Sequence, residues 1–264
     1  MTSTPTAPVA SVADSVAHIR RETGRFVQVA AGSPLEVHVP AYPAFTVETL
    51  SGHIGRVLRL FGHILAGESV AADQLPPAPA GPAVIEWVDE GVEPLLKLIG
   101  EVNPDKLVSL PHGGGERQAR FVAPSVAVEI AVHRWDVESV LGDHVATPRD
   151  LAVHEIEAVF ANFVPRLASS GVAPIGGTVQ LHAADAEISW IVSVQDGRLI
   201  PDRLAASTAD ADVTVSASAE DLALLVWKRA LPPRAGVNVS GNEDVLRRFL
   251  VTNYIPDPRT TPAH

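Results

Sequence analysis

The stretch VEIAVHRWDV, residues 128–137, decides how the first part of the chain folds. Its apolar residues recur at helical spacing, which predicts a helix over residues 124–141 that begins with a proline. At ~100° per residue, Glu129 and His133 lie within ~40° of each other on one face, and Asp136 follows on that face. Apolar neighbours on both sides indicate a largely buried helix, in which polar groups need partners.

A second histidine lies in the helix expected over residues 46–67, where Thr46 is a plausible N-cap and Glu48 falls in the first turn. His53 sits among apolar residues of this helix. A Glu/His pair four residues apart often forms only an intrahelical hydrogen bond. A core histidine on one helix with Glu-x3-His on another is instead the pattern by which helical bundles build metal sites.

The set His53, Glu129 and His133 offers two imidazoles and one carboxylate, which suits zinc or another first-row divalent ion. Three protein ligands leave a coordination position open, as in catalytic sites, and that position can activate a water or a thiol. Asp136 has two readings of similar weight. It either orients a ligand imidazole or forms a salt bridge with a cation such as Arg134.

Helical patterns and Pro-rich connections continue through the first two thirds of the chain, and Pro94 is expected to kink or split one helix. After about residue 177 the pattern changes to alternating, β-like runs followed by helices. Further helices are expected at residues 9–29, 84–100, 149–169, 218–229 and 242–250, and strands at 178–183, 188–194, 211–217 and 237–241. We therefore expect a helical domain over residues 1–172 and a smaller α+β domain over residues 173–264.

Composition limits the classes of function. The chain has 264 residues, of which 46% are hydrophobic and 19% charged, and its net charge of −11 disfavours nucleic-acid binding. No stretch resembles a signal peptide or a membrane span, so a soluble cytoplasmic protein is the expectation. The chain has no cysteine, so any thiol in its chemistry comes from a cosubstrate.

Two segments carry a family resemblance. YPAFTVETLSGHIGR, residues 42–56, resembles the opening motif P-x-aromatic-T-V-x-x-L-x-x-H of the mycothiol-dependent maleylpyruvate isomerase family in the DinB-like superfamily. Residues 129–136 resemble that family's E-x-x-V-H-R-W-D segment, and residues 211–241 look like its smaller C-terminal domain. The resemblance covers nearly the whole chain in the same order. The Ala-Pro-Ser-Val-Ala-Val run before Glu129 departs from the family, which commonly has arginines there.

The resemblance implies a DinB-like up-down helical bundle followed by a sterol-carrier-like α+β domain. It implies that His53, Glu129 and His133 bind a metal, usually zinc, and that the thiol is mycothiol, as in actinobacteria. Arg229 matches a family arginine that holds or polarises the substrate, although at a helix end it also reads as a favourable C-terminal cation.

The function expected from this is a metal- and thiol-dependent enzyme acting on a small electrophile. It is either an S-transferase, which is our first choice, or a cis–trans isomerase working by thiol addition and elimination. In both, Asp136 and Arg229 would support the chemistry. One alternative is a metal-dependent hydrolase with hydroxide at the open position, and another is a non-catalytic protein that binds a small ligand.

Overall fold

A computed structural model of the chain describes residues 11–68, 74–110, 115–163, 175–195, 198–204, 210–230, 233 and 235–252. Backbone contacts divide the chain into two compact units. We call Val9–Val145 the helical unit and Ala146–Asp257 the mixed unit.

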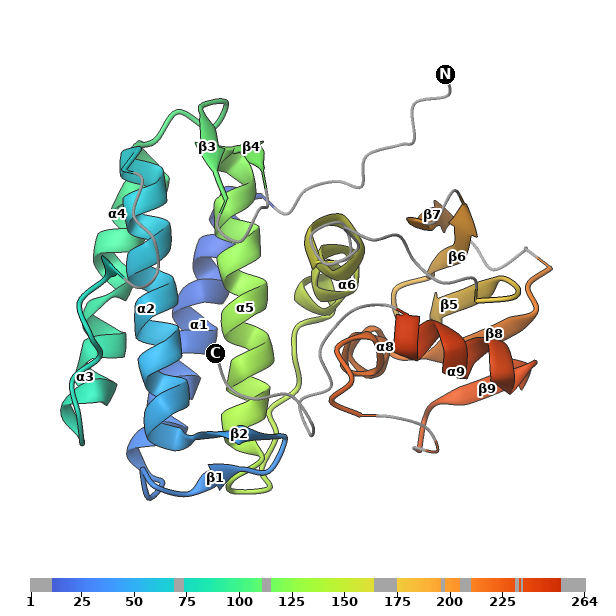
Figure 1. Cartoon of the computed structure of the whole chain (residues 1–264), viewed down its shortest axis with the longest axis horizontal. Helices are drawn as coiled ribbons and strands as arrows, with labels where there is room; N and C mark the ends of the chain where they lie inside the picture. The colour runs from blue at the N-terminus through green and yellow to red at the C-terminus, as the bar shows by residue number, and fades with distance from the viewer. Residues whose placement is uncertain are drawn as a thin grey trace. The chain divides into compact units, whose positions relative to one another are not determined.

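The helical unit is a bundle in which α1, α2 and α5 lie alongside one another (Figure 1). Two short antiparallel strand pairs join its helices, in segments for which only connections are expected from the sequence. The elements are α1 (Val12–Ala31), β1 (His38–Val39), β2 (Tyr42–Thr46), α2 (Val47–Ala66), α3 (Ala83–Glu90), α4 (Val92–Glu101), β3 (Leu107–Ser109), β4 (Glu116–Gln118), η2 (Ala119–Phe121) and α5 (Val122–Glu138). The predicted helical architecture of this part of the chain is confirmed.

Helix α2 begins and ends as its sequence predicts. The Thr46 hydroxyl accepts a hydrogen bond from the Thr49 backbone N–H, and the Thr49 hydroxyl accepts one from the Thr46 N–H, which makes a reciprocal cap. The helix ends at Gly67, whose φ of 86° lies in the left-handed region that favours glycine. Gly55 allows a close helix approach, because a Cβ there would lie 2.3 Å from the Trp87 ring of α3.

The helix expected over residues 84–100 is split, but the break is not at Pro94. It falls at Gly91, between α3 and α4, and Pro94 lies in the first turn of α4. A proline is tolerated there because the first backbone N–H groups of a helix have no intrahelical acceptor. The local rule that proline interrupts a helix therefore gives the right number of helices and the wrong break point.

Helix α5 is buried along most of its 17 residues and packs against α1 and α2. Such burial on several sides explains why its apolar residues do not form a single stripe. The helix nevertheless carries charged side chains, so the packing around it has to supply their partners.

The mixed unit holds a five-stranded sheet with the order β7-β6-β5-β8-β9. All neighbouring strands are antiparallel except β5 and β8, which are parallel, and α8 and α9 both pack on these two central strands. The elements are α6 (Arg149–Ala158), η3 (Val159–Phe163), β5 (Val179–Ala183), β6 (Ile188–Gln195), β7 (Arg198–Leu204), β8 (Val213–Ala217), α8 (Ala219–Val226), β9 (Asn238–Gly241) and α9 (Glu243–Thr252). This confirms the α+β class expected for the C-terminal part.

Strand β7 is absent from the sequence prediction. It contains Pro201, which opposes Val192 of β6. A proline removes a backbone donor and so argues against a central strand. It is tolerated here because β7 is at the edge of the sheet in the part of the chain that the structure describes.

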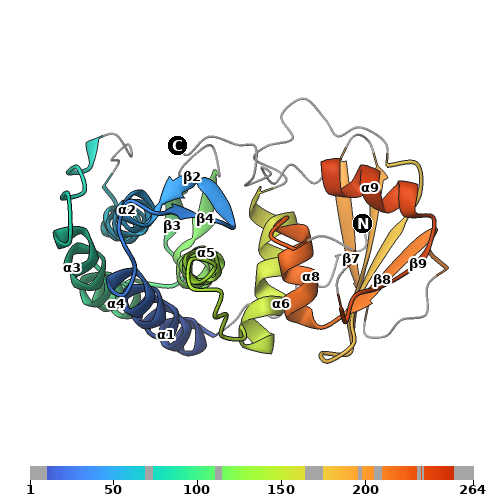
Figure 2. The same cartoon turned by 90° about the horizontal axis from the view of Figure 1, so that it is seen from below.

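Helix α6 belongs to the mixed unit, whereas the sequence assigns it to the first domain. It lies beside α8 (Figure 2). The Trp227 indole N–H donates to the Glu155 carbonyl at 3.1 Å, and Arg203 of β7 pairs with Glu157 at 2.6 Å. The predicted boundary at residues 172–173 lies outside the described residues. That boundary therefore stays a prediction. Contacts between residues distant in sequence group α6 with the mixed unit.

Within the described residues, no helix is both long enough and apolar enough to cross a membrane.

Candidate metal centre

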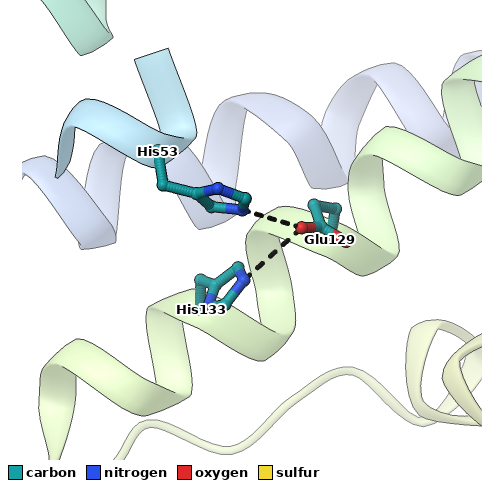
Figure 3. A group of neighbouring side chains, drawn as sticks. All are labelled: His53, Glu129 and His133. Atoms are coloured by element: carbon teal, nitrogen blue, oxygen red, sulfur yellow. Dashed lines mark hydrogen bonds and ion pairs between the residues drawn. The ribbon is translucent and has the colours of Figure 1, made fainter. Parts of the chain in front are cut away.

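Helices α2 and α5 bring together the three side chains that the sequence singles out (Figure 3). The His53 Nε2 atom lies 3.0 Å from Glu129 Oε1, and the His133 Nε2 atom lies 3.4 Å from the same oxygen. One nitrogen or oxygen from each residue lies within 4.8 Å of the others. Residues 76 positions apart in sequence thus form one compact donor set.

This donor set fits a divalent cation. Its atoms are two imidazole nitrogens and one carboxylate oxygen, which are the usual ligands of zinc. The His133 side chain is only 9% exposed, while those of His53 and Glu129 are 26% and 22% exposed. The donor set is therefore partly buried in the protein and still accessible to a small molecule.

Asp136 contacts His133 from behind. The Asp136 carboxylate is fully buried and lies 2.9 Å from His133 Nδ1. A carboxylate at Nδ1 keeps the proton on that nitrogen and leaves the Nε2 lone pair free for a metal. The geometry therefore matches the first reading of Asp136, and its role in the chemistry stays a prediction.

Arg134, the other partner expected for Asp136, instead contacts two glutamates. Its Nε donates to Glu22 at 2.8 Å and its Nη1 to Glu138 at 2.6 Å, and all three side chains are at most 1% exposed. Arg25 adds a further bond to Glu138 at 2.7 Å. We call Glu22, Arg25, Arg134 and Glu138 the buried ion cluster, and it ties α5 to α1.

The electrostatics of the three residues differ. Burial raises the pKa of Glu129, but hydrogen bonds from His133 and His53 outweigh it and hold the pKa well below its usual range. Burial lowers the pKa of His133, but hydrogen bonds with Asp136 and Glu129 outweigh it and raise the pKa from 6.5 to about 9. The pKa of His53 is lowered, mainly by burial. In the absence of metal, one proton therefore stays on His133 at neutral pH, where a cation would replace it.

Two aromatic rings from β2 border the site. The Phe45 ring centre lies 5.6 Å from that of His53 and 6.0 Å from that of His133, and the Tyr42 ring lies 6.4 Å from His133. Their role as a wall of the site is not evident from periodicity. The available signals are the aromatic position of the family motif, which Phe45 fills, and the location of both residues within four positions of the Thr46 cap of α2.

Arg229 lies in the mixed unit, just beyond the end of α8. Its Nη1 donates to the Trp227 carbonyl at 3.0 Å, and its guanidinium carbon lies 5.9 Å from the centre of the Trp227 ring. Its expected contact with a substrate stays a prediction.

Comparison with known proteins gives two family matches. Residues 16–138 match the mycothiol maleylpyruvate isomerase N-terminal domain, and residues 150–248 match the C-terminal domain of the same family. The two matches fall in the helical unit and the mixed unit and together span most of the chain. No curated protein matches the sequence significantly.

Solved structures agree on the fold. The mycothiol-dependent maleylpyruvate isomerase is 15% identical over 91% of this chain and 96% of its own, with a TM-score of 0.58. A histidine-to-alanine variant of a mycothiol-dependent maleylpyruvate isomerase is 16% identical over the same shares, with a TM-score of 0.60. A UbiJ-SCP2 ubiquinone synthesis protein is 23% identical over 45% of this chain and 100% of its own, but its TM-score of 0.30 is too low to argue from.

The two domain matches occur in the family's order, and the fold agrees over nearly the whole length. The chain belongs to the mycothiol-dependent maleylpyruvate isomerase family of enzymes.

Proposed function

We propose that the protein binds a divalent metal, zinc by preference, through His53, Glu129 and His133, and uses it to activate a low-molecular-weight thiol. The observation that carries this proposal is the convergence of three donor atoms from two helices within 4.8 Å. The Asp136 carboxylate behind His133 supports it, because ligand histidines commonly donate their other N–H to such a group.

The thiol comes from outside the protein, because the chain has no cysteine. Mycothiol is the proposed thiol on the strength of the family that both domains match. A low-molecular-weight thiol stays reduced in the cytosol, so a cytoplasmic location belongs to the same proposal.

The proposed reaction is a cis–trans isomerisation by addition and elimination. A bound metal would lower the pKa of the thiol and so supply a thiolate at neutral pH. The thiolate sulfur adds to one carbon of an activated double bond, and the displaced electron pair moves to the conjugated carbonyl oxygen. Rotation about the resulting single bond precedes loss of the thiolate, which restores the double bond in the trans form.

The protein's own groups have separate tasks in this scheme. Glu129 stays ionised, because its pKa lies well below neutrality. Asp136 holds the His133 ring in position. Arg229 is proposed to stabilise the negative charge that develops on the carbonyl oxygen, as a positioned cation does.

An S-transferase shares the first step but retains the carbon–sulfur bond after a leaving group departs. We place the isomerase first because the similar solved structure is a maleylpyruvate isomerase. S-transfer to another electrophile remains the second form of the same proposal.

The test is turnover of maleylpyruvate by zinc-loaded protein with and without mycothiol, followed by chromatography of products. We expect isomerisation that requires both zinc and thiol, and that is lost in Glu129→Gln. Formation of a stable thiol adduct would favour the transferase. Thiol-independent hydrolysis would contradict the proposal and favour the hydrolase alternative.

A further inference from the structure

Arg56 differs from the other arginines on the helices around the metal site. It lies on α2 one turn after His53, so the two side chains are neighbours on the helix surface. The pKa of His53 is lowered mainly by burial and to a smaller extent by the positive charge of Arg56. The side chain is partly buried.

No hydrogen bond or ion pair within the described residues engages the Arg56 side chain. Arg59, one turn further along α2, provides the contrast. Its Nη1 donates to the carbonyls of Gly55 and Trp87 at 3.0 and 2.9 Å, and its guanidinium lies 3.9 Å from the Trp87 ring centre. Arg59 therefore fixes α2 against α3, whereas Arg56 makes no comparable contact there.

The charges around the site favour an anion beside Arg56. Glu129 and Asp136 together balance a divalent cation, so Arg56 gives the metal-loaded site a positive charge before any anionic ligand binds. A partly buried guanidinium loses part of its hydration. Binding a carboxylate offsets that loss, often through two parallel charge-assisted hydrogen bonds. A carboxylate on the reacting molecule would satisfy Arg56 and remain next to the metal.

We propose that Arg56 binds a carboxylate of the electrophilic substrate that reacts at the His53, Glu129 and His133 site. This inference rests on the proposed function and adds the residue that selects an acidic substrate. Arg56 is then a substrate-binding residue on the helix that also supplies His53.

The test is calorimetric titration of zinc-loaded protein with succinate, in the presence of excess 2-mercaptoethanol. This thiol has no carboxylate and would occupy the open metal position as its thiolate, so that succinate reports on its contacts away from the metal. Succinamide, which has the same carbon chain without charge, is titrated in parallel. The proteins compared are the wild type, Arg56→Gln, Arg56→Lys and, as a control, Arg20→Gln, which removes an exposed ion pair with Glu93.

We expect Arg56→Gln to weaken succinate binding by roughly ten- to a hundredfold, the usual effect of losing hydrogen bonds to a charged group. Arg56→Lys should recover part of the affinity, because it keeps the charge but not the paired donors. Succinamide binding and the zinc content should not change, and Arg20→Gln should behave as wild type.

Equal succinate affinity in the wild type and Arg56→Gln would overturn the inference, as would a wild type that does not bind succinate. An equal loss for succinate and succinamide would make Arg56 structural. The thiol is the other molecule that can carry a carboxylate, so 3-mercaptopropionate is titrated separately. If Arg56→Gln weakens binding of 3-mercaptopropionate but not of succinate, the assignment to the electrophilic substrate is overturned. Zinc content, measured on the same samples, tests the metal site independently of Arg56.

Discussion

Helix α5 carries two groups of buried charged side chains, and they differ in how completely the protein satisfies them. In the buried ion cluster, Arg134 contacts Glu22 and Glu138, and Arg25 completes the set. At the metal centre, Glu129 and the two histidines converge on a point in space that the protein leaves to a ligand. The first arrangement is complete without a ligand and therefore structural. The second keeps a proton on His133 at neutral pH when no cation is bound, and such perturbed pKa values are typical of functional sites.

The largest effect is expected from opening the buried ion cluster. Arg134→Leu removes the buried cation that bridges Glu22 and Glu138 and leaves them only Arg21 and Arg25, which are more exposed. Breaking a buried ion pair in this way typically costs about 3–5 kcal/mol. Urea denaturation of the metal-free protein measures the change in the free energy of unfolding. Arg20→Leu, which opens an exposed pair, should cost less than about 1 kcal/mol. Equal small losses for both variants would show that the cluster is not structural.

A smaller and more specific effect is expected from Asp136→Asn. Loss of the carboxylate at His133 Nδ1 should weaken zinc binding by roughly ten- to a hundredfold while the protein stays folded. Competition with a chromogenic chelator measures the affinity. The matched control is Asp143→Asn, an exposed acid on the other side of Arg25, which should bind zinc as the wild type does. Unchanged affinity in Asp136→Asn would remove Asp136 from the metal centre.

The pH dependence separates the metal-free state from the metal-bound state. The pKa of His133 is raised from 6.5 to about 9, so its proton stabilises the metal-free fold below about 6.5, and this contribution is lost as pH rises through 9. Zinc must displace the same proton, so zinc affinity should rise roughly tenfold per pH unit up to about 9. Chelator competition at pH 7.0, 8.0 and 9.0, together with unfolding of metal-free protein at each pH, checks both signs. A flat zinc affinity over this range would contradict a protonated His133.

The sequence predicts the helices and most of the metal centre because both depend on local patterns. The N-caps Thr46 and Ser218 locate the starts of α2 and α8, and the helical spacing of apolar residues locates α5. The same spacing places Glu129 and His133 on one face of α5, and the site follows once His53 is assigned to a neighbouring helix.

The features that the sequence leaves undetermined depend on long-range contacts. Spacing alone cannot show that Arg134 selects Glu22, which is 112 residues away, and so leaves Asp136 for His133. The same holds for α6, which joins the mixed unit through the contacts of Trp227 and Arg203. Arg56 also requires the structure, because only the structure shows that its side chain has no hydrogen-bond or ion-pair partner among the described residues.

The most direct test of the central claim is the metal content of purified protein that has been stripped with a chelator, reconstituted with zinc and desalted. The variant to compare is His53→Ala, and the matched control is His63→Ala, because His63 lies on the same helix but pairs with Glu68. We predict about one zinc per chain in the wild type and in His63→Ala, and none in His53→Ala. Zinc absent from the wild type, or retained in full by His53→Ala, would contradict the account.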